Sequence, residues 1–267
     1  MILYKYLTAE AGIEILKNNS FGFSQPKYFN DPFELLAGYP EYSGDNPFEE
    51  YLYNIRTWAK TNIWSNNTGI LSLTRTYRNP LMWAHYCKNH TGIVIGIDVI
   101  KAGFTDESKC LIPVQFGSVI YSTTKPTNDF LQKLRGDPLN IGHTHHFPRE
   151  HEEKLNRIFL QKPMCWSYEE EVRVAKCIAD IDKNGINKSG MFKLIEVDGK
   201  DLYLFEMPEG CIKELYIGLR HTALNSKKAL SEYIQGVKSH QSYLKTYCST
   251  ISNDTWNMEF YDSSEII

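Results

Sequence analysis

The hydrophobic pattern of the first 26 residues predicts a strand, a helix and a second strand. Residues 2–7, ILYKYL, are rich in aromatic and branched side chains, as strands are. The helix pattern that follows begins at Thr8, a good N-cap residue, and ends at the paired asparagines 18–19. SFGFS then forms a short strand, which Pro26 ends.

A second group of patterns lies between residues 69 and 99. GILSLTR, at residues 69–75, predicts a central strand. Asn79 and Pro80 predict the start of a short helix over 81–89. The continuous apolar run GIVIGIDV at 92–99 indicates a strand that is buried on both faces.

The following region is less regular. VQFGSVIYS at 114–122 predicts a strand, and the polar, Pro- and Gly-containing stretch at about 123–153 predicts an exposed insertion. A helix is expected over 152–161, a strand over 171–179, and a helix over 224–236. Further strands are predicted in the segments MFKLIEV, DLYLFEM and IKELYIG and twice near the C-terminus.

Helices and strands do not alternate as they do in a doubly wound sheet, so we predict an α+β fold. We expect one mixed domain over residues 1–267, with a central, largely antiparallel sheet and flanking helices.

Composition narrows the class of protein. Hydrophobic residues make up 42% and charged residues 23%, which is typical of a globular domain and excludes a disordered chain. A net charge of −3 argues against nucleic-acid binding by the whole surface, although a local basic patch is compatible with it. The 17 Tyr, 13 Phe and 5 Trp are enough to line a pocket for a planar ligand.

Six scattered cysteines without a CxxC pair indicate free thiols, not a zinc ribbon or a redox motif. The N-terminus lacks the apolar core of a secretory signal, and no run approaches the roughly 20 apolar residues of a membrane span. We therefore expect a cytoplasmic protein. The chain also lacks a phosphate-binding GxxxxGK loop or a GxGxxG motif after a strand.

Three consecutive glutamates precede the strand expected at 171–179. On a strand, Glu169, Glu171 and Arg173 would share one face, and Glu170 would lie on the other. Like charges in a row are unfavourable unless they are solvated or paired. The block is therefore either a surface ion pair at a strand end or, as we favour, the edge of a pocket with Glu170 in solvent.

Two other polar groups allow alternative interpretations. In WAHYCKNH, His85 is either a site residue or a histidine that bonds to backbone carbonyls. Asp31, Glu34 and Glu171 could together hold a divalent metal in a nuclease, but Arg173 stands where that chemistry needs lysine. The segment with His143, His145, His146 and His151 is more typical of a solvated loop than of a metal site.

Four blocks carry a family resemblance: YKYLTAEAGIEILKNNSFGFSQPKYFNDPFE, ILSLTRTYRNPLMWAHYCKNHTGIVIGID, WSYEEEVRVAK and IKELYIG. From Tyr4 to Gly218 they resemble the bacterial family known as domain of unknown function 2971. More loosely, the first strand, helix and short strand are similar to the entry of ADP-ribosyltransferase folds. Those enzymes carry a glutamate, often as Glu-x-Glu, at the start of a late core strand, which Glu169 and Glu171 match.

This resemblance implies an enzyme that transfers ADP-ribose from NAD, used as a substrate, to a protein or nucleic-acid acceptor. A toxin or anti-phage effector with a neutralising partner protein fits that class. Glu171 would be the catalytic carboxylate, supported by Glu169, Arg173 and His85. The residues implied in NAD binding are Lys5, Tyr6, Phe23, Ser24, Asn30, Asp31, Tyr86 and Tyr168. The first strand has Tyr-Lys-Tyr where Arg or His is usual. The alternatives to a transferase are the metal-dependent nuclease described above and an inactive module that binds a nucleotide or a partner.

Overall fold

The fold was analysed in a computed structural model, which describes residues 1–33, 42–124, 159–179, 186–187 and 189–265. Glu34, the four histidines at 143–151, most of the insertion expected at 123–153 and most of the helix expected at 152–161 lie outside these residues. The α-helices are α1 (Ala9–Asn18), α2 (Pro47–Asn67), α3 (Pro80–Tyr86) and α6 (Lys227–His240). Short 3₁₀ helices span Pro26–Tyr28, Val114–Phe116, Met164–Glu169, Thr222–Asn225 and Ser263–Glu265.

The strands form a large mixed sheet, which confirms the α+β prediction. They are β1 (Ile2–Leu7), β2 (Ser20–Ser24), β3 (Thr68–Thr74), β4 (Ile93–Asp98), β5 (Ile120–Ser122), β6 (Gln161–Pro163), β7 (Glu171–Cys177), β8 (Ile186–Asn187), β9 (Gly190–Val197), β10 (Lys200–Glu206), β11 (Ile212–Ile217), β12 (Lys245–Ile251) and β13 (Met258–Asp262). The main path runs β13-β12-β11-β4-β1-β3-β2-β10-β9-β8, and β7 pairs with β3. β5 and β6 form a separate parallel pair. In the large sheet, only β11 and β12 run parallel among the strand pairs that the structure describes.

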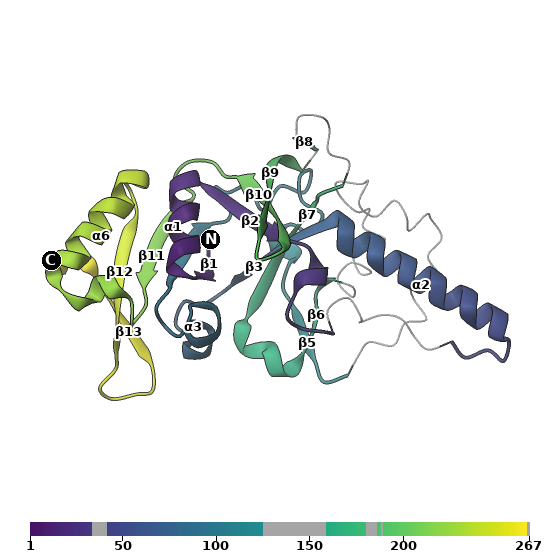
Figure 1. The fold of residues 1–267 in the computed structure, drawn as a ribbon. Helices are drawn as coiled ribbons and strands as arrows, with labels where there is room; N and C mark the ends of the chain where they lie inside the picture. The colour runs from purple at the N-terminus through teal and green to yellow at the C-terminus, as the bar shows by residue number, and fades with distance from the viewer. Residues whose placement is uncertain (34–41, 125–158, 180–185, 188, 266–267) are drawn as a thin grey trace.

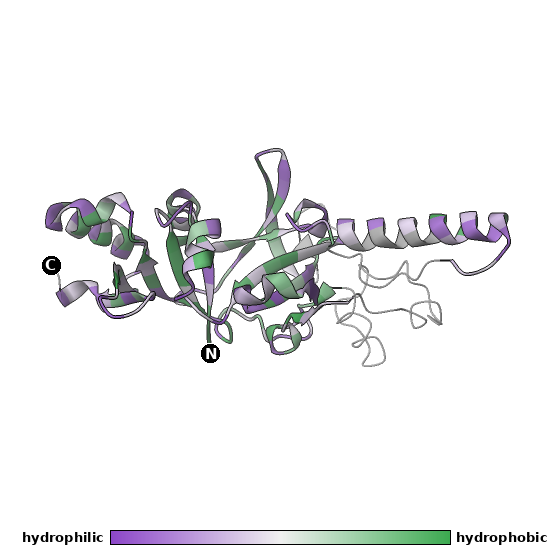
Figure 2. Ribbon diagram, turned by 90° about the horizontal axis from the view of Figure 1, so that it is seen from below, coloured by the Kyte–Doolittle hydropathy of each residue, from purple (hydrophilic) through white to green (hydrophobic). Residues whose placement is uncertain are grey.

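The sheet separates the two ends of the molecule. Figure 1 shows α2 at one end and α6 with β12 and β13 at the other. Figure 2 shows that hydrophobic residues concentrate in the strands, whereas α2 projects from the body and contains both hydrophilic and hydrophobic residues. The main core packs buried aliphatic and aromatic side chains from strands β1 to β4 and β7. Within the described residues, no helix is both long and apolar enough to cross a membrane.

The first helix forms as its sequence predicts. The Thr8 hydroxyl accepts a hydrogen bond from the Ala11 amide at the N-terminus. Asn19 adopts the left-handed conformation, which stops the helix, and its amide donates to Ile15 O. The chain then enters β2 directly. In the sheet, β1 and β2 lie on either side of β3.

Helix α3 is shorter than predicted. Asn79 caps it by accepting a hydrogen bond from the Leu81 amide, and Pro80 follows as the first helical residue. The helix ends at Tyr86 instead of continuing to Asn89, because Lys88, Asn89 and His90 all have positive φ angles of 46°, 58° and 68°. This tight reversal leads into β4.

The prediction of a strand over 114–122 is wrong for most of that segment. Residues 114–116 form a 3₁₀ helix, and only Ile120–Ser122 is a strand. The reason is a backbone crossing at Gly117, whose carbonyl accepts from the Arg173 amide at 2.7 Å. A Cβ at Gly117 would lie 1.8 Å from Arg173 O, so only glycine permits this approach.

The C-terminal helix is also displaced from its predicted position. Residues 222–225 form a 3₁₀ helix, and α6 runs from Lys227 to His240 instead of 224–236. Ser226 sets the start of α6, because its hydroxyl accepts from the Ala229 amide.

Candidate functional site

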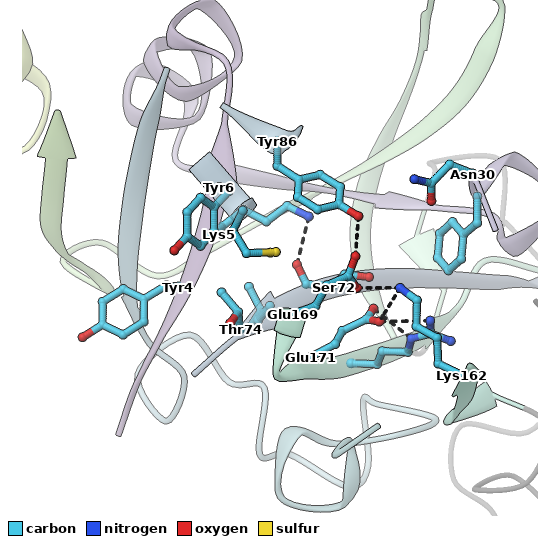
Figure 3. A pocket seen from close by; sticks show the side chains of 14 residues that line it. Tyr4, Lys5, Tyr6, Asn30, Ser72, Thr74, Tyr86, Lys162, Glu169 and Glu171 are labelled. Atoms are coloured by element: carbon cyan, nitrogen blue, oxygen red, sulfur yellow. Dashed lines mark hydrogen bonds and ion pairs between the residues drawn. The ribbon is translucent and has the colours of Figure 1, made fainter. Parts of the chain in front are cut away.

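A cleft of about 170 Å³ lies where β1, β3 and β7 meet α3 and the 3₁₀ helix Met164–Glu169. Figure 3 shows polar side chains from these elements pointing into it. It is lined by Tyr4, Lys5, Tyr6, Phe29, Asn30, Ser72, Leu73, Thr74, Met82, Tyr86, Lys162, Glu169, Glu171 and Arg173.

The strand register explains why the cleft forms here. Thr74 of β3 pairs with Glu171 of β7 and with Tyr4 of β1, which brings three strands together at one level. Tyr4–Thr74 is the only described pair between β1 and β3, so their hydrogen-bond ladder stops there. The Lys5 side chain fills part of the gap, and its Nζ donates to Ser72 O at 2.9 Å.

The glutamate block does not follow one continuous strand. Glu169 ends a 3₁₀ helix, Glu170 has a left-handed backbone with φ of 44°, and Glu171 begins β7. The left-handed residue turns the chain, so Glu169 and Glu171 point into the cleft while Glu170 is exposed. The expected sides are therefore confirmed, although simple strand alternation is not the cause.

Glu171 lies at the centre of a buried ion network. Its Oε1 accepts from Arg173 Nε at 2.9 Å, and its Oε2 accepts from Arg173 Nη2 at 3.2 Å and Lys162 Nζ at 3.1 Å. The side chain of Ser72 makes a smaller contribution to lowering the pKa of this carboxyl group. These three bonds use most of the roughly four acceptor positions that a carboxylate offers.

These partners keep Glu171 ionised. Burial alone would raise the pKa of its carboxyl group, but Arg173 and Lys162 outweigh that effect and lower the pKa to about 2. Arg173 is itself fixed by donation to Phe159 O at 2.6 Å. Glu171 and Arg173 therefore form a rigid, charged floor of the cleft.

Glu169 accepts fewer hydrogen bonds than Glu171 does. One carboxylate oxygen accepts from the Tyr86 hydroxyl at 2.5 Å, and the other accepts from Lys162 Nζ at 2.6 Å. Each oxygen has one acceptor position left, because these are its only partners among the described residues. Burial and the bond to Glu169 both raise the pKa of Tyr86, so it remains a hydrogen-bond donor. Glu169 can thus accept hydrogen bonds from a ligand while keeping its present partners.

The structure brings together seven of the residues expected at the site. Lys5, Tyr6, Asn30, Tyr86, Glu169, Glu171 and Arg173 all line the cleft.

The other predicted residues lie elsewhere. Phe23 is fully buried in the main core against Phe104 and Phe205, so its ring is not available to a ligand in the cleft. Ser24, on β2, does not line the cleft. Asp31 is buried near it, and one of its oxygens accepts from the Phe33 amide.

His85 and Tyr168 lie beside the cleft instead of in it. His85 is exposed, and its ring centroid is 6.3 Å from that of Tyr168. The Tyr168 carbonyl accepts from Asn79 Nδ2 at 2.6 Å, which ties the 3₁₀ helix to the start of α3. The hydrogen bond between Asn79 and Tyr168 therefore stabilises the edge of the cleft.

Lys162 is the main site residue that the sequence did not reveal. It precedes Pro163 on β6, outside any recognisable motif, and pairs with both carboxylates. Its spacings of seven and nine residues from them match neither a helix nor a strand contact. Only the turn made by the 3₁₀ helix brings these side chains together.

The described residues contain no cluster of three or more His, Cys, Asp or Glu side chains that could hold a metal ion. Glu34 and the histidine segment lie outside them. Of the three residues named in the nuclease alternative, Glu171 lines the cleft and Asp31 does not.

Part of the chain matches a model of a known protein family. No curated protein and no solved structure matches the chain. Residues 82–174, from α3 through the first part of β7, match the family described as Protein of unknown function (DUF2971). The match includes Tyr86, Lys162 and the glutamate block, and it supports the similarity to this family seen in the sequence.

Proposed function

We propose that this protein cleaves NAD at the nicotinamide bond in the cleft and transfers the ADP-ribose to a macromolecular acceptor. The observation that carries the proposal is the pair of carboxylates, Glu169 and Glu171, beside Lys5 and Tyr6 of the first strand. They stand where the resemblance to ADP-ribosyltransferases implies a Glu-x-Glu pair.

The two carboxylates have different roles in this proposal. Breaking the bond to nicotinamide builds positive charge on the ribose, which a fixed negative charge nearby stabilises. Glu169 has unused acceptor positions, so it is the group that would contact the ribose and its 2′-hydroxyl. Glu171, which already accepts three hydrogen bonds from Arg173 and Lys162, would position Lys162 and thereby Glu169.

The remaining lining suits part of the same ligand. Tyr86 and Tyr4 offer aromatic surface to a planar ring, and Lys5 can contact ribose oxygens. The cleft is smaller than the roughly 300–1,000 Å³ of a typical ligand pocket. It would therefore enclose the nicotinamide riboside end of NAD, and the adenosine end would lie outside.

The test is release of nicotinamide from NAD by the purified protein, followed by chromatography. Candidate protein and nucleic-acid acceptors are added in separate reactions. We expect release by the wild type, loss of about 10²–10³-fold in rate for Glu169→Gln, and no loss for the exposed Glu170→Gln. Transfer to an acceptor is detected by mass. The proposal is wrong if no reaction releases nicotinamide, or if the two variants behave alike.

A further inference from the structure

The cleft contains two lysines whose amines have opposite surroundings. Lys162 Nζ lies 2.6 Å from Glu169 and 3.1 Å from Glu171. Lys5 Nζ donates only to the neutral carbonyl of Ser72, and no ion pair joins it to a carboxylate among the described residues. One amine is therefore committed to a salt bridge, while the other retains bonding capacity toward the cleft.

This difference decides which amine can act as a nucleophile. The carboxylates raise the pKa of Lys162 despite its burial. Burial lowers the pKa of Lys5, and the more distant Glu171 and Glu169 offset this only in part. An amine attacks carbonyl carbon only when it is unprotonated, so Lys5 is the more reactive of the two.

Proton transfer groups lie around the same space. The Tyr86 hydroxyl donates to Glu169, and both side chains line the cleft with Lys5 (Figure 3). Such a pair can supply and remove protons during addition to a carbonyl and loss of water. Asn30, Ser72 and Thr74 add amide and hydroxyl groups, which suit a ligand with several hydroxyls.

We propose that Lys5 forms a Schiff base with the C1 aldehyde of an open-chain aldose bound in the cleft. The amine lone pair attacks the carbonyl carbon to give a carbinolamine. The carbinolamine then loses its hydroxyl as water: Tyr86 donates its proton to the leaving hydroxyl, and Glu169 accepts the proton that leaves the nitrogen and returns it to Tyr86. The products are an imine and one water molecule, with no change of oxidation state. This activity goes beyond the proposed NAD cleavage and does not require it.

The test traps the imine with sodium cyanoborohydride. The full chain is incubated with ribose 5-phosphate and the reductant, and labelled sites are found by peptide mass mapping. Lys228, whose side chain is 87% exposed, is the internal reference for ordinary amine reactivity. We expect Lys5 to be labelled at least tenfold faster than Lys228, and the fast labelling to disappear in Lys5→Arg, which keeps the cation.

Two outcomes would overturn this inference: Lys5 labelled no faster than Lys228 in the wild type, or fast labelling at another lysine that persists in Lys5→Arg. The wild-type comparison stands even if the variant does not fold. Because the aldose is supplied directly, failure to release nicotinamide from NAD leaves this test intact. Conversely, a protein that releases nicotinamide without labelling at Lys5 would refute only the Schiff base.

Discussion

The two faces of β7 bury positive charge in different ways. On the cleft face, Arg173 binds Glu171 through two nitrogens, and Lys162 bridges Glu171 and Glu169. On the opposite face, Lys176 donates to Ser189 O at 2.7 Å and lies 4.7 Å from the centre of the Phe205 ring. No carboxylate pairs with Lys176 among the described residues.

The difference shows what each face is suited to do. Burial lowers the pKa of Lys176, because a carbonyl and a ring replace little of its hydration. The cleft network remains charged, but such networks rarely stabilise a fold more than apolar residues of the same volume would. The proposed role of the cleft in binding and chemistry would account for a network that stability alone does not require.

Removing one member of the cleft network should have the largest effect. Arg173→Met leaves Glu171 buried with Lys162 as its remaining ion-pair partner, and we expect the free energy of unfolding to fall by about 3–5 kcal/mol. Urea denaturation measures this change. Arg75→Met is the control, because Arg75 is exposed and its loss should cost less than about 1 kcal/mol. If the two variants unfold at the same urea concentration, Arg173 is not an essential partner of Glu171 in the buried network.

The second largest effect should be a loss of stability at acidic pH, caused by protonation of Glu171 in the cleft network. The folded-state pKa of Glu171, about 2, lies below its ordinary 4.5. Ionised Glu171 therefore contributes about 3 kcal/mol above pH 4.5, and this contribution is lost as the pH falls from 4.5 to about 2. The difference in unfolding free energy between wild type and Glu171→Gln, measured against pH, should shrink over that range. A constant difference would mean that Glu171 is not held ionised by its partners.

The opposite face should be the least sensitive. Lys176→Met keeps most of the apolar stem and removes a buried cation that has no carboxylate partner among the described residues, so stability at pH 7 should not fall by more than about 1 kcal/mol. Because the folded-state pKa is lowered, the native protein loses this proton at a lower pH than the unfolded chain does. Buried Lys176 therefore destabilises the fold less as the pH rises. The free energy of unfolding of the wild type should increase relative to that of Lys176→Met at alkaline pH. A loss as large as that of Arg173→Met would erase the contrast between the two faces.

Local sequence signals predicted much of this architecture. Thr8 and Asn79 set the starts of α1 and α3, and apolar runs marked the central strands. The sides taken by Glu169 and Glu171 were also predictable. Their partner Lys162 was not, because its position depends on a 3₁₀ turn and the left-handed Glu170. Phe23 has the residue type of a ligand-stacking ring, but only packing against Phe104 and Phe205 shows that it is core.

In the proposed function, Glu169 contacts the substrate and Glu171 holds the cleft together. The most direct test compares Glu169→Gln and Glu171→Gln in two assays, nicotinamide release from NAD and urea unfolding. We predict that Glu169→Gln retains most of its stability, because the amide oxygen still accepts from a neighbour, and loses about 10²–10³-fold in rate. Glu171→Gln should lose several kcal/mol of stability, because Arg173 and Lys162 lose their shared anion. A folded Glu169→Gln that releases nicotinamide at the wild-type rate would contradict the claim.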